Sequence, residues 1–177
     1  MKLVGLIPTR GAAGGKRLGG GKDLRELGGV PLMAWTIRAA KDSGIFDDVI
    51  VVANDDKYLA IARSYGASIA RRPDYTVEDA SPDIEWVNWF FSGDEEYDAF
   101  AILRVTSPFR TAETIRAAWG TFKSTPGAHS LRTVRRSRED VSKTWVIRHG
   151  RLLPLFPMGD EWHSRPSQLN FGTYIQT

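Results

Sequence analysis

The stretch KLVGLIPTRGAAGGKRLGGGKDLRELGGVPLMAW, residues 2–35, joins an apolar run, a loop rich in glycine and basic residues, and the beginning of a helix. The apolar run Lys2–Ile7 is typical of a strand that is buried on both faces of a sheet. The helix expected after Pro31 ends at Gly44, because glycine adopts the left-handed conformation found at helix C-termini. A strand, a glycine-rich loop and a helix in this order predict an α/β fold.

Strand and helix patterns alternate along the rest of the chain. Further strands are expected at Asp48–Ala53, Ala67–Ala70, Ala99–Val105 and His129–Val134. Helices are expected at Tyr58–Tyr65, after a Ser81 cap followed by Pro82 and Asp83, and after a Thr111 cap. We therefore expect a single domain over residues 1–177, with a doubly wound, mainly parallel, Rossmann-like sheet.

A different pattern follows the last of these strands. Residues 143–156 predict a hairpin that turns at His149 and Gly150, so a small β-rich C-terminal extension is expected. The final FGTYIQT resembles the beginning of a strand, and we expect the protein to be truncated at Thr177.

Composition excludes several classes of protein. The 177 residues carry a net charge of +3 and contain no cysteine, so disulfides and thiolate metal sites are excluded. No apolar run approaches the roughly 20 residues of a membrane span, and the N-terminus is not that of a signal peptide. We expect a cytoplasmic protein that binds neither membrane nor nucleic acid. The basic run Arg132–Asp140 is interpreted as a solvated loop, with nucleic-acid binding as the alternative.

Three loops follow the carboxyl ends of the expected strands, where ligands bind in parallel sheets: Pro8–Lys22, Arg71–Ser81 and Arg104–Thr111. The first holds six glycines and three basic residues between Gly11 and Lys22, which suits a di- or triphosphate. It is not a Walker A loop, because Lys16 occupies the position of the first glycine and Asp23 that of the Ser or Thr. The alternative is a disordered loop with incidental charge.

Several segments resemble a known family. The opening IPTRG…GKDL…LGGVPLMAWTI, the segment RRPDYTVEDASPDI, the block VTSPFRTAETI and the late NFGTYI occur in this order across almost the whole chain. They resemble the acylneuraminate cytidylyltransferases, the CMP-sialic acid synthetase family, whose opening is close to IPARGGSKRIPGKNLRPLGGKPLIAWTI. SKTW, residues 142–145, is also similar to a family segment around a lysine.

The resemblance implies a CTP-dependent nucleotidyltransferase in which a hydroxyl of a sugar acid attacks the α-phosphate of CTP and pyrophosphate leaves. It implies Mg²⁺ as cofactor and a homodimer. The residues that it assigns to the triphosphate are Arg10, Lys16 and Lys22, with Arg10 and Lys22 catalytic and Lys22 nearest the α-phosphate. It assigns Arg72 and Ser81 to the cytosine ring. It assigns Arg104, Thr106, Ser107, Lys143, Asn170 and Tyr174 to the sugar acid.

The chain departs from the family pattern at the expected site. Arg104 replaces a glutamine that faces the sugar, which suggests a different or more acidic acceptor, since a guanidinium binds a carboxylate bidentately. Asp23 replaces an asparagine, and its charge must be neutralised by a lysine or by Mg²⁺, of which it is a possible ligand. The first loop is also a few residues longer than in the family.

The metal site is the least defined part of this expectation. The paired aspartates that bind Mg²⁺ in the family fall beyond Thr177, and Asp55–Asp56 is more typical of a helix start than of a metal pair. Two alternatives therefore stay open. One is a nucleotidyltransferase with another base or acceptor, and the other is a non-catalytic nucleotide-binding paralogue.

Overall fold

The computed structural model of the protein describes residues 1–11, 20–78, 81–93, 96–137, 144–155 and 174–176. Its contacts group into two compact units, Met1–Gly127 and Ala128–Thr177. Each unit is described by itself, and the single domain expected over residues 1–177 stays a prediction.

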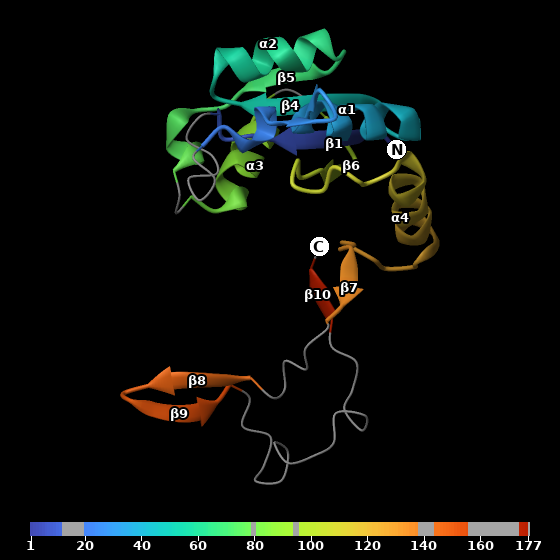
Figure 1. Ribbon diagram of the computed structural model, residues 1–177. Helices are drawn as coiled ribbons and strands as arrows, with labels where there is room; N and C mark the ends of the chain where they lie inside the picture. The colour runs from blue at the N-terminus through green and yellow to red at the C-terminus, as the bar shows by residue number, and fades with distance from the viewer. Residues whose placement is uncertain (12–19, 79–80, 94–95, 138–143, 156–173, 177) are drawn as a thin grey trace. The chain divides into compact units, whose positions relative to one another are not determined.

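The first unit is built on a sheet of four parallel strands (Figure 1). The strands are β1 (Leu3–Pro8), β4 (Asp48–Ala53), β5 (Ser68–Arg71) and β6 (Ala99–Ile102). Their order is β5-β4-β1-β6, with Leu6 of β1 paired to Ile50 on one side and to Ile102 on the other. The chain runs outward from β1 to β5 and then returns to the opposite side of β1. This reversal creates a switch point between β1 and β6, where ligands bind in such sheets.

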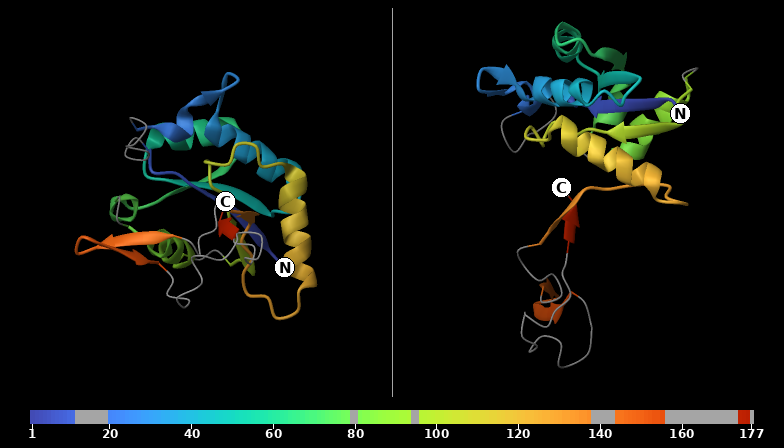
Figure 2. Two further views of the ribbon diagram at one scale, coloured as in Figure 1. Left: turned by 60° about the horizontal axis from the view of Figure 1, so that its bottom comes forward. Right: turned by 90° about the vertical axis from the view of Figure 1, so that its right-hand side faces the viewer.

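Helices cover both faces of this sheet (Figure 2). The long helices are α1 (Leu32–Ser43), α2 (Asp56–Ser64), α3 (Asp83–Phe91) and α4 (Ala112–Ser124). Ile7 and Val51 pack with α1 and α2, whereas Leu6 and Val52 pack with α3. Neighbouring residues of one strand thus enter opposite cores, because side chains alternate along a strand. The expected doubly wound α/β fold is confirmed.

Short elements fill the connections around these strands and helices. Between β1 and α1 lie the 3-10 turn η3 (Lys22–Leu24) and the antiparallel pair β2 (Glu26–Leu27) and β3 (Val30–Pro31). The 3-10 turn η4 (Asp74–Val77) follows β5. In the described ranges no helix combines the length and the apolar character needed to cross a bilayer.

The expected helix ends are confirmed except at Ser81. Gly44 ends α1 with a φ of 64°, and the Thr111 hydroxyl accepts a hydrogen bond from the Thr114 amide at the start of α4. The Ser81 cap is wrong. Its hydroxyl donates instead to the Tyr75 carbonyl at 2.8 Å, and α3 begins only at Asp83, with Pro82 at the N-cap position.

The second unit contains two antiparallel pairs of strands. They are β7 (Val134–Arg136) with β10 (Tyr174–Gln176), and β8 (Trp145–Arg148) with β9 (Arg151–Pro154). The expected hairpin is confirmed, and its turn residues His149 and Gly150 both have a positive φ, as the commonest two-residue hairpin turn requires. These strands form the expected β-rich C-terminal extension.

The fifth strand expected at His129–Val134 is wrong. Strand structure begins only at Val134, and β7 pairs antiparallel with β10 rather than joining the parallel sheet. Residues 129–134 are all exposed, and Ala128 before them is half-buried. A segment without buried side chains lacks the apolar contacts that hold a central parallel strand in place.

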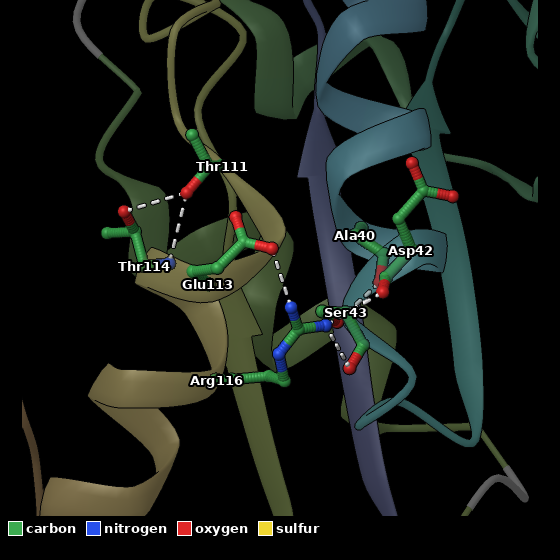
Figure 3. A network of polar contacts seen from close by, with 7 residues as sticks. All are labelled: Ala40, Asp42, Ser43, Thr111, Glu113, Thr114 and Arg116. Carbon is green, nitrogen blue, oxygen red and sulfur yellow. Dashed lines mark hydrogen bonds and ion pairs between the residues drawn. The ribbon is translucent and has the colours of Figure 1, made fainter.

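Arg116 of helix α4 forms hydrogen bonds with the C-terminal end of α1 (Figure 3). The Arg116 guanidinium donates to the carbonyls of Asp42 at 2.9 Å and Ser43 at 3.3 Å, and it pairs with Glu113 at 2.7 Å. The last carbonyls of a helix lack partners within the helix and carry partial negative charge. A cation from α4 therefore satisfies the C-terminus of α1 and links the two helices.

We expect Arg116→Met to lower the free energy of unfolding by about 1–2 kcal/mol, because it keeps the aliphatic stem but removes the charged donors. Urea unfolding followed by tryptophan fluorescence measures the change. Arg63→Met on the exposed side of α2 is the matched control, with an expected change below about 0.5 kcal/mol. Equal effects of the two substitutions would contradict this role of Arg116.

Candidate active site

A cavity of about 220 Å³ opens at the switch point between β1 and β6. Three segments line it: the end of β1, the turn η3, and the loop after β6. The lining residues are Pro8, Arg10, Lys22, Asp23, Arg104, Val105 and Thr106. The cavity thus lies beyond the carboxyl ends of the strands, between two of the three loops that were expected to bind ligand.

Two glycines shape the backbone beside the lining cations. Gly11, directly after Arg10, has a φ of 54°, and a Cβ there would lie 2.8 Å from Cβ of Asp55, so no larger side chain fits without a shift. Gly21, with a φ of 61°, turns the chain before Lys22 at the start of η3. The positions of Arg10 and Lys22 therefore depend on left-handed conformations that glycine adopts without strain.

Asp23 is a buried carboxyl group in this cationic cavity, with 4% of its surface exposed. Burial raises the pKa of Asp23, while the Lys22 charge, a hydrogen bond from the Arg10 backbone amide and the Arg72 charge act in the opposite direction. Lys22, the amide and the buried Arg72 thus offset only part of the cost of burying this carboxylate, and its pKa stays raised.

Arg72 follows β5 and is 3% exposed. Its Nε and Nη2 find no hydrogen-bond partner in the described part of the chain. Burial, reinforced by the charges of Arg10 and Arg104, lowers the pKa of Arg72 to about 10, and Asp83 and Asp23 oppose this shift. Leaving buried charged donors without partners costs free energy, so these groups are suited to an incoming acceptor atom of a ligand.

Arg104 forms an ion pair with Asp83, the first residue of α3. The second carboxylate oxygen of Asp83 accepts a hydrogen bond from the indole Nε1 of Trp86 at 3.0 Å. The Arg104 carbonyl accepts from Nη1 of Arg110 at 3.3 Å. Both the side chain and the backbone of Arg104 are thereby held where the residue lines the cavity.

The structure brings only part of the predicted site together. The predicted residues that line one cavity are Arg10, Lys22, Asp23, Arg104 and Thr106, with Arg72 in electrostatic contact. Ser81 and Ser107 are not among the lining residues. Lys16, Lys143 and Asn170 lie outside the described residues, and Tyr174 lies in β10 of the second unit. The functional roles assigned to all of these residues stay predictions.

Asp83 was missed as a member of the site, and so were the lining residues Pro8 and Val105. The sequence identified Asp83 only as an early acidic residue of a helix.

Asp55 and Asp56 behave as expected for a helix start: the Asp55 side chain accepts from the Lys57 amide at 2.9 Å, and Asp56 pairs with Arg71. Within the described ranges, no group of three His, Cys, Asp or Glu residues is arranged to bind a metal ion.

The raised pKa of Asp23 has a consequence for stability. A carboxyl group whose pKa is higher in the folded than in the unfolded protein favours folding when protonated, and this contribution is lost as the pH rises through the folded pKa. We therefore expect Asp23→Asn to raise the free energy of unfolding at pH 7, and the difference from the parent to shrink in acid. Urea titrations between about pH 4 and 8 measure both effects.

Asp42→Asn, at an exposed position of α1, is the matched control and is expected to change the free energy of unfolding by less than about 0.5 kcal/mol. A less stable Asp23→Asn protein at pH 7 would mean that the neighbouring cations stabilise the carboxylate by more than burial penalises it.

Residues 4–145 match the family model described as cytidylyltransferase. This match covers more than half of the chain, and the chain belongs to the cytidylyltransferase family. The resemblance to the acylneuraminate cytidylyltransferases is confirmed by relatives that carry this name.

Among these relatives, the N-acylneuraminate cytidylyltransferase of Escherichia coli is 38% identical over 114 residues, which are 64% of this chain and 26% of the relative. The CMP-N,N'-diacetyllegionaminic acid synthase of Legionella pneumophila is 41% identical over 127 residues, which are 67% of this chain and 52% of that one. The chain thus spans about a quarter to a half of the length of these relatives.

Solved structures support the fold. A CMP:2-keto-3-deoxy-manno-octonic acid synthetase complexed with CTP has a TM-score of 0.62 at 19% identity, over 77% of this chain and 52% of the other. The 4-diphosphocytidyl-2C-methyl-D-erythritol synthase of Anaerococcus prevotii has a TM-score of 0.58 at 14% identity, over 85% of this chain and 63% of the other. At such identities the likeness supports the nucleotidyltransferase-type fold alone.

Proposed function

We propose that the protein is a cytidylyltransferase that activates a sugar acid with CTP. A hydroxyl oxygen of the acid forms a bond to the α-phosphorus, the bond from that phosphorus to the β-phosphate oxygen breaks, and pyrophosphate leaves while the hydroxyl proton is released. The observation that carries the proposal is the cation-lined cavity at the switch point, in a chain of the cytidylyltransferase family. The names of the relatives from Escherichia coli and Legionella pneumophila support the sugar acid as acceptor class.

Charge on the departing pyrophosphate is the main electrostatic demand of this reaction. Arg10 and Lys22 line the cavity and supply cations to stabilise it, with Lys22 nearest the α-phosphate. The unpartnered donors of Arg72 suit the carbonyl and ring nitrogen of cytosine. Arg104 and Thr106 are assigned to the acceptor. Further assignments from the resemblance are Lys16 to the triphosphate, Ser81 to the base, and Ser107, Lys143, Asn170 and Tyr174 to the acceptor.

Mg²⁺ belongs to the proposal as well, and its fit rests on Asp23. Mg²⁺ is commonly held by one or two carboxylates together with substrate phosphates and water. Asp23 is the carboxylate among the lining residues, and its pKa is raised, as expected for a carboxylate whose full counter-charge comes from a ligand. When bound, the ion would neutralise part of the triphosphate charge. A homodimer and a cytoplasmic location complete the proposal.

The activity is tested by incubating the full chain with Mg²⁺, each of the four nucleoside triphosphates, and N-acetylneuraminate or another sugar acid, while pyrophosphate release is followed. We expect release with CTP that depends on the acceptor. Release with another nucleotide would identify a relative with a different base specificity. CTP binding in calorimetry without turnover on any acceptor would favour the non-catalytic paralogue.

A further inference from the structure

The carboxylate of Asp83 is fixed through both of its oxygens. One accepts from Nε1 of Trp86 at 3.0 Å, and the other pairs with Nη2 of Arg104. Trp86 is 1% exposed and packs in the core between α3 and the sheet, with Val4, Leu6 and Val52. Because the indole is locked by the core, Asp83 has a defined orientation, and it transmits this orientation to Arg104.

Arg104 keeps donor groups for a ligand. Its guanidinium has three nitrogens with five N–H donors, and the ion pair with Asp83 occupies Nη2. Within the described residues no partner is recorded for Nε and Nη1, and 50% of the side chain is exposed where the residue lines the cavity. The Arg104 guanidinium is therefore a cation that is fixed in position and keeps N–H donors for a ligand. Two parallel donors of a planar guanidinium match the two oxygens of a carboxylate.

The two sides of the cavity carry different chemistry. The β1 side carries two lining cations, Arg10 and Lys22, and one lining carboxyl group, Asp23. The β6 side carries one lining cation, Arg104, and one hydroxyl, Thr106. A triphosphate bears several negative charges and suits the side with two cations. An acceptor that bears one carboxylate and several hydroxyls suits the side with one cation and a hydroxyl. A carboxyl group offsets part of the positive charge on each side, Asp23 on the β1 side and Asp83 on the β6 side, so the β1 side stays the more positive of the two.

We propose that Arg104 determines acceptor specificity by binding the carboxylate of the sugar acid, and that Asp83 is the positioning residue that holds Arg104 for this contact. The inference rests on the proposed function and deepens it, because it names the group of the acceptor that is recognised. Asp83 takes no part in the chemistry and does not contact the acceptor.

The test compares two acceptors, N-acetylneuraminate and its uncharged carboxamide, with CTP and Mg²⁺ and the full chain. Arg104→Gln is expected to raise KM for the acid about tenfold to a hundredfold, as expected for a lost charge-assisted hydrogen bond, and to leave KM for the carboxamide and for CTP within about twofold. Asp83→Asn keeps an oxygen for the Trp86 indole but loses the ion pair. It is expected to raise KM for the acid about threefold to tenfold.

The double variant separates a positioning role from a general structural one. If Asp83 acts through Arg104, Arg104→Gln combined with Asp83→Asn is no worse than Arg104→Gln alone, because the interaction that Asp83 supports is already absent. Additive effects, or an equal rise of KM for the carboxamide or for CTP, would overturn the positioning role. A KM for the acid that stays within twofold in Arg104→Gln would overturn the specificity role.

Failure of the proposed function is recognised separately, by the absence of pyrophosphate release from the unmodified protein. In that case calorimetry with N-acetylneuraminate decides the inference: binding that is weakened at least tenfold by Arg104→Gln supports carboxylate recognition, and unchanged or absent binding rejects it.

Discussion

Replacement of Lys22 by alanine is expected to lower kcat/KM for pyrophosphate release from CTP by about 100- to 1000-fold. Lys22 lines the cavity at the switch point and stands at the start of η3, in a conformation set by Gly21. Removing one preorganised donor that stabilises a developing negative charge typically has an effect of this size. The loss should fall mainly on kcat, because the charge on pyrophosphate grows as the bond to the α-phosphorus breaks.

Lys123→Ala is the matched control, since Lys123 lies in the last turn of α4 and is not among the residues that line the cavity. Its kcat/KM should stay within about twofold of the parent. Thermal unfolding of both variants shows whether a loss of activity comes from a loss of fold. A folded Lys22→Ala protein with full activity would remove Lys22 from the proposed mechanism.

The largest expected effect on stability belongs to Trp86. Trp86→Ala should lower the free energy of unfolding by about 3–5 kcal/mol, because removal of a side chain that is only 1% exposed leaves a large cavity in the core between α3 and the sheet. Urea unfolding followed by far-UV circular dichroism measures this change without relying on the fluorescence of the replaced tryptophan.

Two further variants resolve the effect of Trp86. Ile84→Ala on the same helix is 58% exposed and should cost less than about 0.5 kcal/mol. Trp86→Phe keeps most of the apolar volume but loses the indole donor to Asp83. Its unfolding free energy should fall by less than that of Trp86→Ala, and KM for the acid acceptor should rise. A Trp86→Ala protein as stable as the parent would show that the core repacks around the lost ring.

The elements of the first unit could be predicted because each has a local cause in the sequence. Leu, Val and Ile in β1 indicate a strand buried on both faces, Gly44 supplies the left-handed end of α1, and the Thr111 hydroxyl begins α4. The hairpin at His149 and Gly150 also depends on two adjacent residues. Local signals of this kind need no knowledge of tertiary structure.

The errors arose where a contact outside the expected helix or strand decides the outcome. Ser81 has the composition of a helix cap, but its hydroxyl is used by the Tyr75 carbonyl of the preceding turn. Val134 pairs with a strand near the end of the chain rather than with the parallel sheet.

The candidate site was predictable to the extent that strand ends share one edge of the sheet. The loops that carry Arg10, Lys22 and Arg104 were expected to bind ligand on that ground, and these three residues line one cavity. The contact between Arg104 and Asp83 could not be inferred in this way, because it joins residues 21 positions apart on a loop and a helix whose approach depends on the strand order. The unpartnered donors of Arg72 are likewise visible only once burial is known.

The central place of β1 also bears on how the protein folds during synthesis. Leu3 pairs with Ala99, so β1 acquires its second neighbour only after about 95 further residues have emerged, which takes about 5–20 s at typical rates of translation. Over that interval an apolar strand with at least one open edge is exposed to aggregation and to chaperones. β1 is therefore expected to need protection until β6 leaves the ribosome.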